Sequence, residues 1–177
     1  MFNEGETAKD GMGGMNGKPA LMVMVSYHHK NTEKVAMVMA KVLNAVMSSP
    51  HELNVTDLGR YRLIGFGSGI YDGMHHRSLL EFAEKLPTMN GTKVFLFSTS
   101  AIMGRRKVAG DHSRLRDILQ KKGCVVVDEF ACKGFNTNSF LKHIGGMNKG
   151  RPNDEDLARA KAFARGVTSR LLRYDDL

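Results

Sequence analysis

The chain contains no tryptophan, only two cysteines and no long apolar run. Cys124 and Cys132 lack the spacing of metal ligands, so we expect reduced thiols in a cytoplasmic protein. No apolar run approaches the roughly 18–20 residues that cross a bilayer, so membrane insertion is not expected. The first residues lack a basic segment followed by an apolar core, which argues against a signal peptide.

Acidic residues are in deficit, since 26 basic and 18 acidic residues give a formal net charge of +8. Such a charge is typical of proteins that meet nucleic acid, anionic lipid or an acidic protein. The basic residues are nevertheless spread out, with short clusters only at Arg105-Arg106-Lys107 and Lys121-Lys122, and aromatic residues are few. No RNA- or DNA-binding motif accompanies these clusters, so a nucleic-acid partner is not expected.

The 177 residues divide by composition into a tail and one domain. Residues 1–18 are Gly-rich, polar and without periodicity, which predicts a flexible tail, and residues 19–177 carry regular patterns. The expected strands are Ala20–Val25, Ala45–Ser48, Leu63–Gly67, Lys93–Phe97 and Cys124–Phe130. Helical patterns alternate with them, and a last helix is expected after the cap residue Asn153. The alternation predicts a doubly wound α/β sandwich of three layers.

Three segments that follow expected strands are rich in Ser, Thr, Gly, Asn and His: residues 26–32, 68–76 and 98–106. Ligands of such sheets bind beyond the carboxyl ends of the strands, where the strand order reverses. The three segments meet there only if the five parallel strands have the order 2-1-3-4-5. We therefore expect that order and a binding site built from these segments.

The first segment, SYHHKNT, joins a buried strand to a helix. Free backbone N–H groups and the positive end of a helix dipole favour an anion at such a junction, and Ser26, Asn31 and Thr32 could bind phosphate oxygens. An ordinary helix cap at Asn31 or Thr32 is the simpler alternative. Neither a Walker pattern nor a dinucleotide fingerprint is present, and the glycines at 65, 67 and 69 lack the spacing of a nicotinamide site.

The other segments carry residues suited to a flat ligand. Tyr71 could stack on such a ligand or simply pack within its loop. The small residues from Ser98 to Ala101 let the backbone approach a ligand closely. A long connection spans residues 131–152, and its residues Phe135, Asn136 and Thr137 form either an outer wall of the site or a cover for the sheet edge.

In combination, these stretches resemble the flavodoxin family. The resemblance rests on MVSYHHKNTEKVA, YRLIGFGSGIYDGMHH, FLFSTSA and EFACKGFNTNSFLKHIGGMNKGRPNDEDLARAKAFA, and covers nearly everything from Pro19 onward. It implies a flavodoxin-like five-stranded fold with FMN, whose phosphate binds the first segment and whose isoalloxazine lies between the other two. The implied cofactor-binding residues are Ser26, Tyr27, His28, His29, Lys30, Asn31, Thr32, Ser68, Gly69, Ile70, Tyr71, Ser98, Thr99, Ser100, Ala101 and Phe135. Lys30 stands where the family usually has glycine, and Tyr71 would replace the family's stacking tryptophan.

The resemblance implies an FMN-binding electron-transfer protein that shuttles one or two electrons between redox partners. An FMN-dependent oxidoreductase acting on a quinone or porphyrinogen is one alternative, because the first segment is similar in length to that of menaquinone-dependent protoporphyrinogen oxidases. A basic binding module without cofactor is another. The charge predicts partners with an acidic docking face, and a homodimer is also compatible with the sequence. The adjacent histidine pairs His28-His29 and His75-His76 suggest a metal site. No cysteine or carboxylate is placed to complete the ligand set, so no metal is expected.

Overall fold

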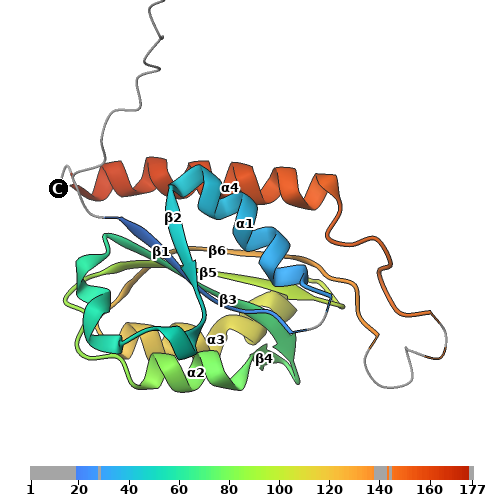
Figure 1. Cartoon of the computed structure of the whole chain (residues 1–177), viewed down its shortest axis with the longest axis horizontal. Helices are drawn as coiled ribbons and strands as arrows, with labels where there is room; N and C mark the ends of the chain where they lie inside the picture. Colours follow the sequence, from blue (N-terminus) through green and yellow to red (C-terminus); the bar gives the residue numbers. More distant parts are fainter. Residues whose placement is uncertain (1–18, 28, 138–142, 144, 176–177) are drawn as a thin grey trace, which may run out of the picture.

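A computed structural model of the protein describes residues 19–27, 29–137, 143 and 145–175. The tail expected over residues 1–18 therefore lies outside the described residues, as does His28. Within the described chain a central sheet is covered on both faces by helices, which makes three layers (Figure 1). The predicted α/β fold class is confirmed.

Five parallel strands form the body of the sheet: β1 (Ala20–Val25), β2 (Ala45–Ser48), β3 (Leu63–Tyr71), β5 (Lys93–Ser100) and β6 (Val125–Lys133). Their order is β2-β1-β3-β5-β6, which for the parallel strands is the predicted one. A sixth strand, β4 (Met74–His75), pairs antiparallel with the end of β3 and was not predicted. The strand register aligns the carboxyl ends of β1, β3 and β5, where the site was expected.

Helices α1 (Asn31–Leu43) and α4 (Asp154–Asp175) cover one face, and α2 (Arg77–Glu84) and α3 (Arg105–Lys121) cover the other (Figure 1). Two short 3₁₀ helices, η1 (Pro50–Glu52) and η2 (Val55–Arg60), lie in the crossover from β2 to β3. The predicted cap of α4 is present, because Asn153 and Asp156 each accept a hydrogen bond from the other's backbone N–H at 3.1 Å. No helix among the described residues is long and apolar enough to cross a bilayer.

Alternate glycines of β3 make room for phenylalanines on the face beneath α1 and α4. A Cβ added to Gly65 would lie 2.4 Å from the ring of Phe95, and one added to Gly67 would lie 2.1 Å from the ring of Phe97. Both rings are fully buried, and each contributes about 1.5–3 kcal/mol through burial. This packing, rather than a nucleotide, accounts for the glycine run. Even a change of Gly67 to alanine would displace the Phe97 ring.

Two predicted loops are shorter than expected. Strand β3 continues to Tyr71 because Asp72 and Gly73, with φ of 49° and 77°, form a two-residue hairpin turn that leads straight into β4. Strand β5 continues to Ser100, and α3 already begins at Arg105, so the basic cluster 105–107 occupies a helix start rather than a loop. The extra length of β3 and β5 comes from hydrogen bonds to neighbouring strands, which the composition of the sequence does not reveal.

Both cysteines are buried free thiols, as expected. Burial raises the pKa of Cys124 to about 11. Cys132 lies deeper, and burial, followed by the nearby charge of Asp156, raises the pKa of its thiol to about 12. Both side chains therefore remain protonated and act as small apolar core residues.

Candidate functional site

An open pocket lies at the carboxyl ends of β1, β3 and β5, where ligands of such sheets bind. It is lined by Ser26, Tyr27, Asn31, Thr32, Gly69, Ile70, Tyr71, Thr99, Ser100, Ala101, Gly134, Phe135 and Asn136. All three predicted segments contribute, together with the start of the long connection after β6. The fold therefore brings most of the predicted site residues together at this pocket.

The first segment reaches the pocket through a left-handed turn. His29 and Lys30 have φ of 54° and 52°, a left-handed region that favours glycine, so both residues hold a strained backbone here. Helix α1 then begins at Asn31 without a side-chain cap from Lys30. The hydroxyl of Ser26 accepts the Glu33 N–H at 3.3 Å. Because the first N–H groups of a helix have no intrahelical partner, this turn offers donors to an anion.

Asn31 and Thr32 are held in place by hydrogen bonds to other segments. The Asn31 Nδ2 donates one of its two hydrogens to the carbonyl oxygen of Phe135 at 2.7 Å, which fixes the direction of the side chain. Its Oδ1 is buried and has no partner among the described residues, which leaves an acceptor suited to a ligand hydroxyl. The hydroxyls of Thr32 and Thr99 are 2.9 Å apart and join the first segment to β5.

Aromatic rings gather at the pocket mouth. The ring of His76 lies 5.3 Å from that of Tyr71, in an edge-to-face arrangement, and 4.9 Å from that of Tyr27. Burial, and then the nearby Tyr27, raises the pKa of the Tyr71 phenol above its ordinary value. Tyr71 also lies against Gly69, where an added Cβ would be 3.1 Å from the ring. A rigid ring thus forms one wall of the pocket.

The connection after β6 forms the opposite wall and is held to the sheet. The Gly134 N–H donates to the Ser100 carbonyl at 2.9 Å. Asn148 donates from Nδ2 to the carbonyl of Ala101 at 2.7 Å. A Cβ at Gly134 would come within 3.0 Å of Asn31, so only glycine fits there without displacement. Phe135 and Asn136 line the pocket as one interpretation of this connection anticipated, whereas Gly134 was missed because nothing in the sequence marks its contact with Asn31.

Several predicted residues do not line the pocket. His29 faces the connection, with its Nε2 2.7 Å from the Thr137 hydroxyl and its ring 4.4 Å from that of Phe135. Lys30 is exposed and 3.5 Å from a carboxylate oxygen of Glu33.

Ser68 and Ser98 point to the other face of the sheet, because side chains alternate along a strand. His28 lies outside the described residues.

The histidines of the described chain do not form a set of metal ligands. In the part of the chain that the structure describes, no three His, Cys, Asp or Glu side chains come together as metal ligands would. His75 and His76 are neighbours in sequence, but their side chains lie in different places. His75 is buried beside His112 of α3, whereas His76 lies at the pocket mouth, next to Tyr71.

Comparison with known proteins agrees with the fold. A family model described as a flavodoxin domain matches residues 22–135. An uncharacterized protein of Methanocaldococcus jannaschii is 42% identical over 148 residues, which is 84% of this chain and 97% of that protein. Flavodoxin 2 from Bacillus cereus has a similar structure, with a TM-score of 0.64, 16% identity and coverage of 86% of this chain and 99% of that one.

Two further solved structures share the fold. A flavodoxin from the domain Archaea has a TM-score of 0.63 at 15% identity, covering 86% of this chain and 98% of that one. A WrbA-like flavodoxin from Agrobacterium tumefaciens has a TM-score of 0.61 at 15% identity, covering 88% and 98%.

Proposed function

Because this chain belongs to the flavodoxin domain family, we propose that it binds FMN in the pocket and transfers electrons between redox partners. The observation that carries the proposal is the convergence of an anion-suited helix start, a wall with an aromatic ring and a long connection on one pocket. Fold similarity alone would not support it, since one fold serves many functions.

The residues present fit FMN. The open turn before α1, with the hydroxyls of Ser26 and Thr32, supplies donors for a phosphate. The unpartnered Oδ1 of Asn31 suits a hydroxyl of the ribityl chain. Gly69 and Gly134 line the pocket with main chain alone, and a Cβ at either position would press on Tyr71 or Asn31, which also line it. Tyr71 provides a ring face or edge for the isoalloxazine.

Bound FMN would supply one- and two-electron chemistry, and the protein would hold and shield it. Tyr71 and Phe135, which both line the pocket, would limit water at the flavin. The turn before α1 would anchor the phosphate. The titratable lining groups among the described residues are the exposed Tyr27 and the partly buried Tyr71. Burial raises the pKa of the Tyr71 phenol, so it stays protonated. This arrangement favours electron carriage over proton-transfer catalysis.

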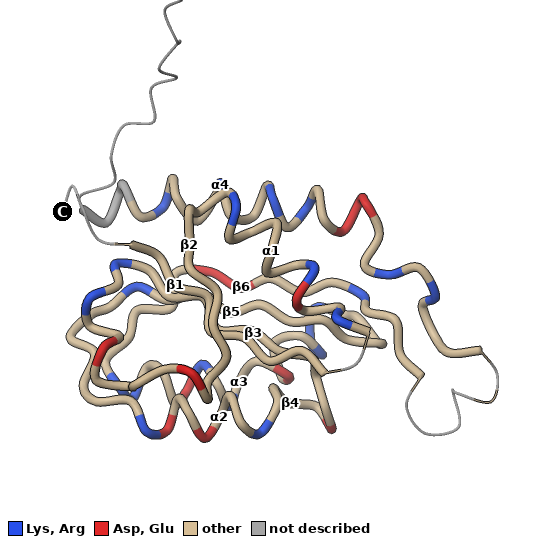
Figure 2. Tube along the Cα trace, viewed as in Figure 1, with Lys and Arg blue, Asp and Glu red and all other residues tan. Residues whose placement is uncertain are grey.

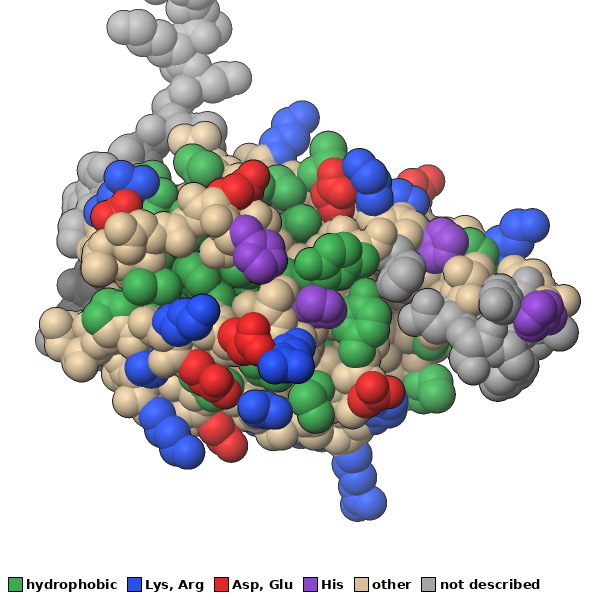
Figure 3. All heavy atoms as spheres, turned by 60° about the horizontal axis from the view of Figure 1, so that its bottom comes forward, with side chains coloured by type: hydrophobic (Ala, Val, Ile, Leu, Met, Phe, Trp, Pro, Cys, Tyr) green, Lys and Arg blue, Asp and Glu red, His purple; other side chains and the backbone are tan. Residues whose placement is uncertain are grey.

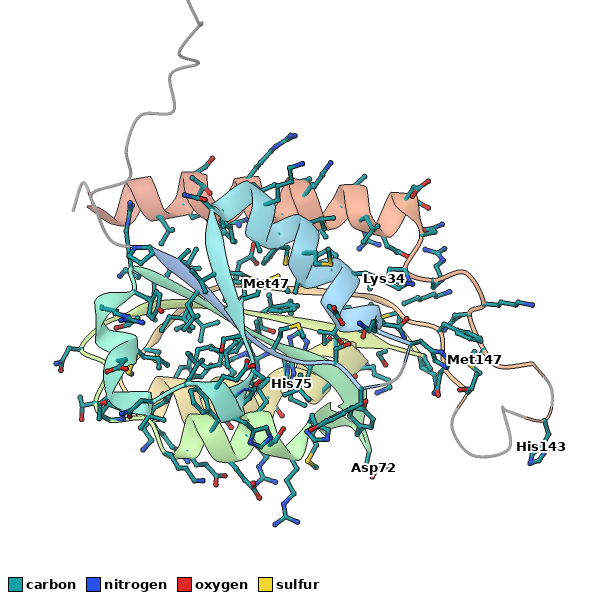
Figure 4. All side chains as sticks on the ribbon, viewed as in Figure 1. Lys34, Met47, Asp72, His75, His143 and Met147 are labelled. Atoms are coloured by element: carbon teal, nitrogen blue, oxygen red, sulfur yellow. The ribbon has the colours of Figure 1, made fainter. Side chains whose placement is uncertain are left out.

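Charge near the pocket suggests the kind of partner. Arg105 and Arg106 are exposed in the first turn of α3, which holds no acidic residue. The exposed apolar residues Tyr27, Ile102 and Met147 belong to the same end of the molecule (Figure 4, Met147). Figure 2 shows further basic residues along α4, and Figure 3 shows acidic and basic side chains interspersed on the face that carries α2. We therefore favour redox partners with an acidic docking face around an apolar centre.

The proposal is tested by purifying the full chain, identifying any released flavin by chromatography, and following an anaerobic reductive titration by visible absorption. We expect one FMN per chain, reducible and reoxidisable without loss from the protein. Purified protein that neither contains FMN nor binds added FMN would contradict the proposal. Rapid turnover of a quinone by the reduced protein would instead favour an oxidoreductase.

The phosphate site can be tested separately by comparing the binding of FMN with the binding of riboflavin. Ser26→Ala and Thr32→Val remove hydroxyls from the phosphate side of the pocket, and each should weaken FMN by about 10- to 100-fold, the range for a hydrogen bond to a charged group. Binding of riboflavin, which has no phosphate, should change little. Ser113→Ala, which removes a hydroxyl on α3 outside the pocket, is the control. Equal losses for both ligands would place the phosphate elsewhere.

A further inference from the structure

Two serines lie directly behind the pocket wall. Ser68 of β3 and Ser98 of β5 are register partners, and each is followed by a residue that lines the pocket, Gly69 or Thr99. Both serine side chains are almost fully buried, at 0% and 1% exposure. Each is hydrogen-bonded to a buried histidine, so a polar network underlies the pocket in an otherwise apolar layer.

The Ser98 branch is complete. The Ser98 Oγ is 2.8 Å from Nε2 of His112, and Nδ1 of His112 is 2.9 Å from a carboxylate oxygen of Glu129. Burial acts to raise the pKa of Glu129, but hydrogen bonds from His112 and Arg116 outweigh it and lower the pKa to about 2. The ionised carboxylate accepts from Nδ1–H of His112, and Nε2 of His112 pairs with the Ser98 hydroxyl. Every polar atom of this branch therefore has a partner.

The Ser68 branch ends at the pocket. Its Oγ lies 2.7 Å from the Gly69 carbonyl oxygen, 2.9 Å from the His76 N–H nitrogen and 2.9 Å from Nδ1 of His75. A hydroxyl has one hydrogen, and two oxygens at 2.7 Å need it between them. Ser68 therefore donates to Gly69 and accepts from the His76 N–H and from His75, which must carry its proton on Nδ1.

This proton arrangement explains an orphan atom. Nε2 of His75 is buried and has no partner among the described residues. With the proton on Nδ1, the orphan is a bare lone pair rather than a stranded N–H, and unpaired acceptors are tolerated better than unpaired donors. Figure 4 shows His75 between the sheet and the lower helices.

The surroundings keep His75 neutral. Burial, followed by His112 with its ring 4.8 Å away, holds the pKa of His75 well below its usual range, and Glu129 opposes them only in part. Ser68 on β3 is bonded to His75, and burial also lowers the pKa of His76, the next residue in the chain.

We propose that His75 is a positioning residue for the cofactor pocket, acting through Ser68 to fix the Gly69–Ile70 peptide in the pocket wall. This inference rests on the proposed function. Because a trans peptide carries its C=O and N–H on opposite sides, a Gly69 carbonyl held by Ser68 sends the Ile70 N–H the other way. Gly69 and Ile70 both line the pocket, so the ligand meets one defined orientation of this peptide.

The two serines supply a matched pair of variants. Ser68→Ala and Ser98→Ala each remove a buried hydroxyl bonded to a histidine, but only Ser68 contacts a pocket-lining carbonyl. We expect Ser68→Ala to weaken FMN by about 3- to 10-fold, the range of one neutral hydrogen bond, and to shift the flavin potential. Ser98→Ala should change FMN affinity by less than about 2-fold. Equal effects of the two variants would overturn the proposal.

His75 allows a rescue experiment. In His75→Asn the amide nitrogen stands where Nδ1 stood and can donate to Ser68, whereas His75→Leu removes the donor. The Asn variant should retain the FMN affinity and potential, and the Leu variant should lose them like Ser68→Ala. Loss of both properties to the same extent in the two His75 variants would overturn the relay through Ser68.

A measurement without flavin separates this inference from the proposed function. Nitrogen-15 NMR of the flavin-free protein should find His75 protonated at Nδ1, and hydrogen exchange at residues 69–71 should quicken in Ser68→Ala but not in Ser98→Ala. A proton on Nε2, or unchanged exchange, would overturn the assignment even if FMN binds. Failure of the parent protein to bind FMN would overturn the proposed function and with it the role of His75 in cofactor binding.

Discussion

Asn31 and Phe135 are joined across 104 positions of sequence by a hydrogen bond of 2.7 Å from Nδ2 to the main-chain carbonyl. The bond connects the turn before α1 to the connection that follows β6. His29 reinforces it from the same turn, through its ring contact with Phe135 and its bond to Thr137. The turn before α1 and the connection after β6 are therefore coupled, so a substitution at Asn31 should affect the structure of both.

Replacing Asn31 by Ala should lower the free energy of unfolding by about 1–3 kcal/mol, because the part-buried Phe135 carbonyl loses its donor. Asn31→Asp should cost more, since a carboxylate oxygen would face the carbonyl. Urea unfolding of the flavin-free protein measures both. If Asn31→Asp proved as stable as the parent, the connection would be held by its other bonds, such as Gly134 to Ser100.

The strand and helix alternation was predictable because apolar periodicity reports directly on burial. The strand Ala45–Ser48 has the predicted bounds, and the three ligand segments meet as the strand order requires. The hairpin to β4 was missed although Asp72-Gly73 is a strong turn signal, because the segment was interpreted as one loop. The directions of Ser68 and Ser98 depend on the face each side chain takes, which composition does not give.

Contacts between residues far apart in the sequence could not be predicted for another reason. The sequence does not show that Gly134 must clear Asn31, or that Asn31 donates to Phe135, because these contacts follow from how the connection folds back on the sheet. Likewise His112 and Glu129 lie on α3 and β6 and meet Ser98 only in the folded chain. The sequence could predict where a site lies, but not which of its side chains are already engaged.

Tyr71 provides the next prediction. Tyr71→Ala should weaken FMN by about 2- to 12-fold, the range of one aromatic contact, and should raise the fluorescence of bound flavin. Tyr71→Phe keeps the ring and should match the parent within about 2-fold. Fluorescence titration measures both. If the Ala variant bound and quenched flavin as the parent does, Tyr71 would serve only to pack the hairpin against Gly69.

Acid should destabilise the protein through His75. Its pKa is depressed well below 6.5 in the folded state, so the unfolded chain binds a proton first as the pH falls. Stability is therefore full above pH of about 6.5 and is lost below it, with a slope of up to about 1.4 kcal/mol per pH unit for one proton. Denaturant unfolding at several pH values between about 7 and 5 measures this slope.

His75→Asn is the control, because it keeps a donor toward Ser68 but does not titrate. Its stability should fall less steeply with acid than that of the parent. Some slope should remain, since burial also lowers the pKa of His76. Parallel curves for the parent and the Asn variant would show that His75 is protonated in the folded protein without penalty.

The basic start of α3 should govern encounters with charged redox partners. No described residue lies within ion-pair distance of Arg105 or Arg106, whereas Lys107 is paired with Asp111 at 2.7 Å. Electrostatic steering mainly changes the association rate and weakens as salt screens it. Reversing Arg105 and Arg106 to Glu should therefore slow the oxidation of the reduced protein by ferricyanide, a small anion, about 10-fold or more at low salt.

The other end of the same helix supplies the matched control. Reversing Lys121 and Lys122 to Glu changes the net charge equally, but these residues end α3 far from the pocket. If local charge steers the encounter, this variant should react with ferricyanide at nearly the parental rate, and a cationic oxidant should show the opposite preference with the Arg105 and Arg106 variant. FMN affinity should be unchanged in both, because none of the four residues lines the pocket. Equal slowing by the two double variants would assign the effect to net charge, and the docking face would then lie elsewhere on the protein.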